Sequence, residues 1–269
     1  MADESVSAYG KKSILRLSVS RAGIEDAYFT SPLKVMKPFR EHGLTRVMII
    51  SVSAGIMAGD TQEYDISALD NARAEISSQS FEKLHDMAGG SASQHSRVTV
   101  GRGAELMYRP LPVIPFAGSA FDSTMDIQLA DDTSKLIYAE ILSCGRAARG
   151  EDFMYRRYFS DVSISRAGEL IYLDRVRYTP ETFAMSGLCM YEEYTHLGTF
   201  VLAGYGENGA GEELAAEARE AIGEMKIDGG ASVLFSGDVV VKALAHGSEP
   251  LMRLEEKLKN LVESKGVRA

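Results

Sequence analysis

The chain has 269 residues, with 38 Asp and Glu against 29 Lys and Arg, a formal net charge of −9. This acidic balance argues against a nucleic-acid-binding protein, because contacts to phosphates need clustered lysines and arginines. Hydrophobic residues make up 45% of the chain, which is normal for a globular protein and excludes disorder as the overall state. No apolar run is long enough to span a bilayer and no cationic amphipathic segment suggests a membrane surface, so we expect no membrane partner.

The two cysteines, Cys144 and Cys189, are too few for a disulfide scaffold or a cysteine-rich zinc module. Residues 1–5 are polar and acidic, unlike a signal peptide, and the chain has no N-x-S/T glycosylation site. Together these features predict a cytoplasmic protein.

The first two-thirds of the chain predict a series of short strands. Each is an alternating or continuous apolar segment, and Gly, Asp or Ser residues separate it from the next. The predicted strands cover residues 14–19, 47–52, 63–67, 73–77, 97–100, 104–108, 125–129, 135–142, 153–159, 161–165 and 170–178. Short strands at this regular spacing indicate a mainly β architecture.

The last third predicts two helices around a hairpin. Residues 211–222 are rich in helix formers, and residues 231–236 and 239–244 read as strands joined by a turn. A second helix follows Ser248, a plausible N-cap, and runs to about residue 264. No linker or exact repeat interrupts the chain, so we expect one elongated domain over residues 1–269, with helices near 211–225 and 249–264.

Three carboxylates stand in unusual contexts. Asp60 ends a glycine loop, residues 54–60, that is neither a P-loop nor a dinucleotide fingerprint, so a tight turn closed by Asp60 is the favoured interpretation. Glu140 ends an apolar strand, and a pair with Arg146 or Arg149 is favoured over a ligand role.

Asp174 is the third carboxylate. Period-two alternation places it on the same strand face as Tyr172, with Leu173 and Arg175 on the other face. If the leucine side is the core, Asp174 faces solvent or a lumen; the alternative is an ordinary exposed strand carboxylate.

No catalytic constellation is visible in the sequence. The five histidines are scattered without metal-ligand spacing, there is no G-x-S-x-G motif, and Cys144 has no adjacent base. A binding role therefore competes well with an enzymatic one. Carboxylates lining a wet channel would hold a divalent cation weakly, through oxygen ligands and water. A metal-dependent enzyme and an unrelated β-rich binding module remain the alternatives.

Several segments, taken in order, resemble the motifs of one family. The segment Phe29–Phe39 fits a PL-x-x-x-x-PF opening, and the loop 55–60 ends in Gly-Asp. The most specific run is 140–146 together with 150–153. The other segments are residues 76–83, 111–116, Asp174-Arg175 and 242–251. This ordered set is similar to the UreD/UreH family of urease accessory proteins, from about residue 15 to residue 261.

The resemblance implies a scaffold or chaperone rather than an enzyme. It implies a stacked-sheet, β-helix-like fold with two helices, required for GTP-dependent assembly of the urease nickel metallocentre. It also implies that the protein binds the accessory protein UreF, which recruits the GTPase UreG, and that this complex docks on the urease apoenzyme. Hydrolysis of GTP by the partner fits the missing P-loop. No cofactor is expected to bind tightly, and Ni²⁺ would pass transiently.

By their positions in the motifs, the resemblance implies that Asp60, Glu140 and Asp174 line a nickel path. Isolated carboxylates in water release Ni²⁺ more readily than a Cys/His cage would. The chain departs from the family at Ser53-Ala54-Gly55, where Pro-Gly-Gly is common, and at Thr61, where an acid is common. Glu63 and Glu82 are the residues that could compensate for the missing acid.

The C-terminal helix is the candidate contact for a protein partner, through Leu251, Leu254 and Leu258. The same apolar stripe is equally explained as a core-facing side of the helix.

Overall fold

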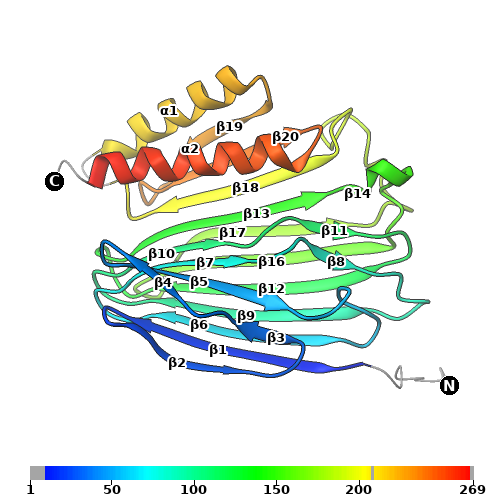
Figure 1. Ribbon diagram of the computed structural model, residues 1–269. Coiled ribbons are helices and arrows are strands. Elements are labelled where there is room, and N and C mark those ends of the chain that lie inside the picture. Colours follow the sequence, from blue (N-terminus) through cyan, green and yellow to red (C-terminus); the bar gives the residue numbers. More distant parts are fainter. Residues whose placement is uncertain (1–9, 207–208, 267–269) are drawn as a thin grey trace.

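The computed structural model describes residues 10–206 and 209–266. Two large β-sheets are stacked face to face in this part of the chain, and two helices lie on one of them (Figure 1). The smaller sheet has seven strands, in the spatial order β17 (Glu169–Tyr178), β16 (Arg157–Arg166), β12 (Ala120–Leu129), β9 (Ala92–Val100), β6 (Thr61–Ala68), β1 (Lys12–Ser20) and β2 (Gly23–Phe29).

The larger sheet has eleven strands. Its main path runs through β19 (Asp228–Val233), β20 (Val239–Ala245), β18 (His196–Ala203), β13 (Lys135–Ser143), β10 (Glu105–Arg109), β7 (Arg73–Ser78), β5 (Leu44–Ser51) and β3 (Leu33–Val35). Off this path, β4 (Phe39–Glu41) pairs with β5, while β11 (Val113–Pro115) pairs with β13 and with β8 (Glu82–Leu84). A short pair, β14 (Gly145–Arg146) and β15 (Glu151–Asp152), flanks the 3₁₀ helix η1 (Ala147–Arg149).

The chain builds the two sheets by coiling between them. It passes in turn through β5, β6, β7, β9, β10, β12, β13 and β16, which alternate between the larger and the smaller sheet. Neighbours β6, β9, β12 and β16 are parallel, as are β5, β7, β10 and β13. Antiparallel strands flank this stack, with β2 at one end of the smaller sheet and β17 at the other. The predicted mainly β, β-helix-like architecture is confirmed.

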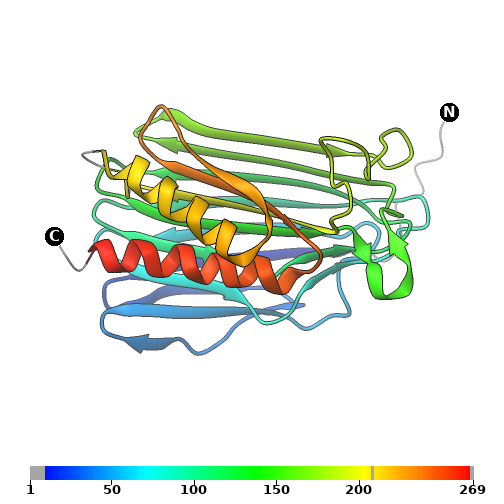
Figure 2. The same ribbon diagram turned by 90° about the horizontal axis from the view of Figure 1, so that it is seen from above.

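Both predicted helices are present, as α1 (Ala210–Met225) and α2 (Ser248–Gly266). They lie side by side on the outer face of the larger sheet, over β13, β18 and β20 (Figures 1 and 2). Their apolar stripes form a second core with that sheet, in which Leu214, Phe200 and Leu254 are each at most 1% exposed. Neither helix, nor any other in the described ranges, is long and apolar enough to cross a membrane.

An ion-pair network also fixes α2 to the larger sheet. Arg109 on β10 donates to Glu75 Oε1 on β7 at 2.9 Å and to Glu255 on α2. Lys259 Nζ on α2 contacts Glu75 Oε2 at 3.2 Å. Because Arg109, Glu75, Glu255 and Lys259 are all largely buried, each charge is held by a partner rather than by water.

Two local sequence expectations differ from the structure. Residues 153–159 and 161–165 do not form two strands, since β16 runs unbroken from Arg157. On β17 the leucine side is not the core: Leu173 is 46% exposed and Arg175 also faces outward, whereas Tyr172 is buried between the sheets. Asp174, on the face of Tyr172, therefore points toward the inter-sheet space.

Candidate functional site

The inner face of the seven-stranded sheet changes from apolar to polar along its strands. One row of neighbours in register across it is aliphatic: Leu17, Ile66, Val98, Ile127 and Ile164. Two rows further along the same inner face, the neighbours in register are polar: Ser13, Gln62, Gln94, Ser123 and Ser160. The row beyond it, Ala92, Phe121 and Tyr158, is again apolar and belongs to a separate buried cluster. The interior thus has a fully apolar half and a second half, called the polar half here, that contains the polar row.

The larger sheet has a matching polar row. Glu140 on β13 is in register with Thr199 on β18, which is in register with Lys242 on β20. Residues in register have their side chains on the same face, and Glu140 shares its face with the buried Tyr138. The polar rows of the two sheets therefore face each other.

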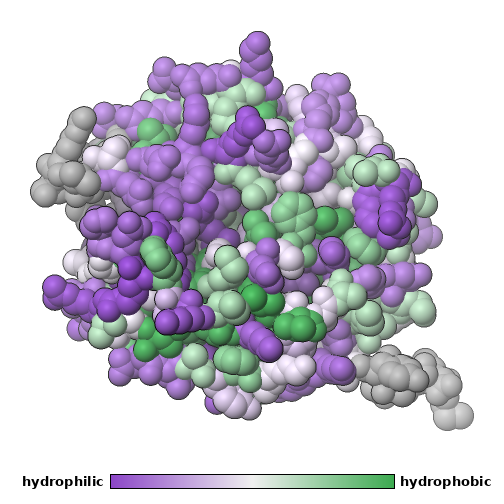
Figure 3. Space-filling model, viewed as in Figure 1, coloured by the Kyte–Doolittle hydropathy of each residue, from purple (hydrophilic) through white to green (hydrophobic). Residues whose placement is uncertain are grey.

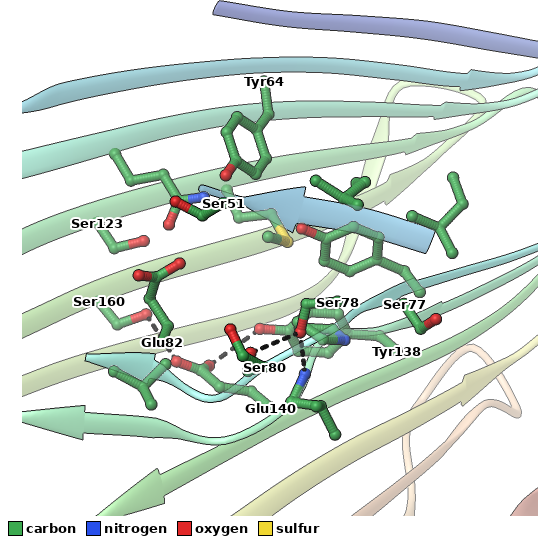
Figure 4. Close-up of a pocket in the computed structure, with 18 of the residues that line it drawn as sticks. Ser51, Tyr64, Ser77, Ser78, Ser80, Glu82, Ser123, Tyr138, Glu140 and Ser160 are labelled. Atoms are coloured by element: carbon green, nitrogen blue, oxygen red, sulfur yellow. Dashed lines mark hydrogen bonds between the residues drawn. The ribbon is translucent and has the colours of Figure 1, made fainter. Parts of the chain in front are cut away.

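Between these rows lies a cavity of about 100 Å³ (Figure 4). A cavity of this size has room for several water molecules where polar groups line it. Glu82 and Glu140 line it together with serines, glutamines and tyrosines, namely Ser51, Ser77, Ser78, Ser80, Ser123, Ser160, Gln79, Gln94, Tyr64, Tyr108, Tyr138 and Tyr158. Apolar side chains complete the lining, among them Leu33, Ile49, Ile76, Val113, Phe121, Met125 and Val162. The lining is thus mixed: apolar side chains alternate with hydroxyl and amide groups, and two carboxyl groups are present.

Glu140 is held by hydroxyl groups from both sheets. Tyr138 Oη donates to Glu140 Oε2 at 2.9 Å, and Tyr158 Oη on β16 donates to Oε1 at 2.8 Å. Burial raises the pKa of Glu140, and the two tyrosine hydrogen bonds oppose that rise. The predicted Glu–Arg pair is wrong, because Arg146 instead pairs with Glu151 across the β14–β15 hairpin.

Glu82 is the second carboxyl group of the cavity, and the structure distinguishes it from Glu63. Burial raises the pKa of Glu82 to about 7, with a hydrogen bond from the backbone of Lys83 opposing the rise. Glu63 lies on the outer face of the seven-stranded sheet, where it pairs with Lys12 at 2.7 Å. Of the two acids that could compensate for Thr61, only Glu82 faces the interior.

Asp174 lies at the edge of the inter-sheet space rather than in the cavity. Its Oδ2 accepts a hydrogen bond from Tyr172 Oη at 3.1 Å and contacts Lys242 Nζ at 2.6 Å. This ion pair joins β17 of one sheet to β20 of the other. Asp174 also raises the pKa of Glu140 by charge repulsion, so the structure brings these two predicted residues into one electrostatic neighbourhood.

Asp60 is in a different place. Its two carboxylate oxygens accept hydrogen bonds from the backbone N–H groups of Met57, at 2.9 Å, and Lys11, at 3.0 Å. Asp60 does not line the inter-sheet cavity. These contacts match the tight turn expected from the residues alone, and a role for Asp60 in a nickel path stays a prediction.

Leu251, Leu254 and Leu258 are at most 1% exposed and pack against the larger sheet. Core packing thus accounts for the apolar stripe of α2, and partner contact through this helix stays a prediction. The face over the helices is largely hydrophilic, whereas apolar residues gather lower on the same side (Figures 1 and 3). There Phe39 on β4, Met48 on β5 and Met36 after β3 are 62%, 42% and 43% exposed.

The cysteines and histidines offer little alternative chemistry. Burial raises the pKa of Cys144 to about 12, and its Sγ donates to Asp152 Oδ1 at 3.2 Å, so it does not form a reactive thiolate. Burial lowers the pKa of His196 to about 4, which keeps it neutral. Across residues 10–206 and 209–266, no three His, Cys, Asp or Glu side chains are grouped to hold a metal ion.

The sequence analysis raises a lumen near Asp174 but does not locate the polar row, although the sequence carries a signal of it. In β1, β6, β9, β12 and β16 a serine or glutamine faces inward near the start of the strand, and the last inward-facing residues are aliphatic. One strand of this kind is ordinary, but five side by side indicate a polar compartment inside a stack.

Comparisons with known proteins agree on one family. The family model described as UreD urease accessory protein matches residues 11–268. "Urease accessory protein UreH" of Helicobacter acinonychis (strain Sheeba) is 38% identical over 266 residues, covering 97% of this chain and 98% of the relative. "Urease accessory protein UreD" of Acetivibrio thermocellus is 38% identical over 194 residues, covering 70% and 74%.

Proposed function

Since the chain belongs to the UreD family of urease accessory proteins, we propose that it is a non-enzymatic scaffold for GTP-dependent assembly of the urease nickel centre. In this proposal it binds UreF, which recruits the GTPase UreG, and the complex docks on the urease apoenzyme in the cytoplasm. Ni²⁺ passes through the polar half of the interior. The observation that carries the nickel path is the cavity lined by Glu82 and Glu140.

The polar groups of the cavity suit a cation that binds only transiently. The polar groups in the cavity lining are carboxyl, hydroxyl and amide groups, whose oxygen atoms bind Ni²⁺ less firmly than thiolates or imidazoles do. A path needs sites that are favourable enough to enter and weak enough to leave. Glu82 and Glu140 supply carboxyl oxygens inside the stack, and Asp174 supplies a carboxylate at the edge between the sheets.

The partner surface is proposed from the exposed residues. The leucines of α2 are buried, so UreF would contact the polar side of α2 and the apolar patch formed by Met36, Phe39 and Met48. Contiguous exposed apolar residues are a common mark of a protein interface. The missing P-loop leaves GTP hydrolysis to UreG.

The path is tested by measuring nickel per urease active site in cells that co-express urease with its accessory proteins. The variant E82Q/E140Q keeps the shape of both side chains but removes their charge, and we expect at least a tenfold loss of nickel. The control E63Q removes a carboxylate from the outer face and should load urease normally. Capture of UreF by each variant shows that assembly is intact. Normal nickel content with E82Q/E140Q would refute the path but leave the scaffold role standing.

The partner surface is tested by a pull-down of UreF. We expect Phe39→Glu to lower capture of UreF at least tenfold, because it buries a charge in the apolar patch. The control is Phe235→Glu, since Phe235 is 77% exposed in the β19–β20 turn, away from that patch. Equal losses in both variants would contradict this location for the interface.

A further inference from the structure

Lys242 occupies a particular position in the polar rows. It is the last side chain in the row Glu140, Thr199, Lys242 of the larger sheet, because its other neighbour in register is Gly230. On the facing sheet, Asp174 is the last residue of an inner row that includes Tyr64, Met125 and Val162, all of which line the cavity. Lys242 and Asp174 thus meet where the polar half of the interior reaches the sheet edges.

The ammonium group of Lys242 serves two carboxylates. It contacts Asp174 Oδ2 at 2.6 Å, and its charge stabilises the ionised form of Glu140, whose pKa it lowers. The side chain is nevertheless 45% exposed. An exposed ammonium on a flexible four-carbon stem can move, unlike the buried guanidinium of Arg109.

A second place for the ammonium group lies next to the first. Lys242 lines a separate cavity of about 260 Å³ together with Tyr178, Cys189, Tyr191 and Asp228. Asp228 on β19 has its side chain on the same sheet face as Lys242, since its partner in register is Leu244, two residues along β20. A rotation of the lysine stem therefore takes the ammonium group from Asp174 toward another carboxylate.

We infer that Lys242 is an exchangeable internal cation, which neutralises Asp174 in the metal-free protein and is displaced when a divalent cation binds there. This inference rests on the proposed nickel path and deepens it. An ammonium group and a divalent cation cannot both occupy the Oδ2 side of Asp174, since like charges repel strongly at that distance. Lys242 thereby weakens binding of the cation, so that the metal is released rather than stored.

The test measures Ni²⁺ binding to the purified full-length chain by calorimetric titration and equilibrium dialysis. Lys242→Met removes the charge and keeps most of the stem, and we expect it to tighten Ni²⁺ binding at least tenfold. The double variant D174N/K242M should lose that gain. Lys257→Met is the matched control, because Lys257 is 44% exposed and contacts Glu224 at the same distance of 2.6 Å; it should bind as the wild type does. Unchanged or weaker binding by Lys242→Met overturns the inference.

A measurement on the wild-type protein tests the same inference if the Lys242→Met variant does not fold. The rate of acetylation of each lysine is followed by mass spectrometry, with and without saturating Ni²⁺. Displacement of Lys242 should raise its labelling rate severalfold, while the rate at Lys257 stays constant. An unchanged rate at Lys242 contradicts the inference. These readouts use the isolated chain, whereas the proposed function is judged by nickel in urease, so either can fail without the other.

Discussion

The same strands line both halves of the inter-sheet interior, but their inward-facing residues are apolar in one half and include a polar row in the other. In the apolar half, rows such as Leu17, Ile66 and Val98 are at most 2% exposed and form a continuous core. In the polar half, Gln94, Ser123 and Ser160 face a cavity across from Glu140. The backbone pairing is continuous through both halves, so the difference arises only from which residues point inward. One half stabilises the stack, and the other leaves room for water and ions.

The largest expected effect is a difference in the free energy of unfolding between a variant in the apolar half and a variant in the polar half. Leu17→Ala should lower the free energy of unfolding by about 3 kcal/mol, because it opens a cavity in close-packed surroundings. Ser123→Ala, in the polar half, should change it by less than about 1 kcal/mol, since the serine already faces a cavity. Urea denaturation of both variants measures the contrast, and similar losses would show that the polar half is packed as tightly as the apolar one.

The next effect concerns pH. The pKa of Glu82 is about 7 in the folded protein against an ordinary value of 4.5, so between these values the folded state binds more protons than the unfolded state. Its stabilising contribution is complete below about pH 4.5 and is lost as the pH rises through 7. The loss between pH 5 and 7 is about 2 kcal/mol.

The variant E82Q removes this contribution from the pH dependence. Denaturation across pH 5 to 7 should therefore show a more positive slope of stability against pH for E82Q than for the wild type. Other groups add to the slope of both proteins: the raised pKa of Glu140 makes stability fall with pH, and the lowered pKa of His196 makes it rise. E63Q is the control on the outer face and should keep the wild-type slope; a wild-type slope in E82Q would mean that Glu82 is solvated like a surface acid.

A smaller effect tests whether Asp60 anchors its loop. Asp60→Ala removes the acceptor of two backbone N–H groups and should lower the free energy of unfolding by about 1 kcal/mol. Asp60→Asn keeps one acceptor and should recover part of the loss. If Asp60→Ala left stability unchanged yet lowered nickel in urease, the loop would belong with the polar half as part of the path.

The smallest effect on stability is expected for Glu140→Gln. Burial already disfavours the charged form of Glu140, and the amide keeps an oxygen acceptor for Tyr138 or Tyr158, so the change should be under about 1 kcal/mol. Nickel in urease should nevertheless fall. A large loss of stability instead would place Glu140 among the structural residues and weaken its assignment to the path.

The sequence predicted the elements better than their surroundings. Strand alternation and the two helices could be read directly, because the period of apolar residues is a local property. The partners of Glu140 could not, since Tyr158 comes from the opposite sheet and meets Glu140 only through the coiling of the chain. Sequence proximity favoured Arg146, which lies nearer in the chain but pairs with Glu151.

The three carboxylates stood out in the sequence, but only the family resemblance assigned them to a nickel path, and the geometry separates them. Glu140 lines the cavity, Asp174 lies at its edge with Lys242, and Asp60 anchors a loop. Glu82 entered only as a substitute for a missing acid, because nothing local in residues 80–84 indicates that this side chain turns inward. Its position depends on β8 pairing with β11, a contact between short strands that no periodicity predicts.

The placement of β2 has a consequence for how this protein avoids self-association. In a coiled stack of parallel strands, the last strand of each sheet has no partner on one side. Its unpaired backbone groups can pair with a strand of another chain. Here the antiparallel β2 takes that position. Its middle carries the adjacent exposed acids Glu25 and Asp26. Charges on an edge strand oppose pairing with a second β-sheet, so this short acidic strand protects the stack from edge-to-edge aggregation.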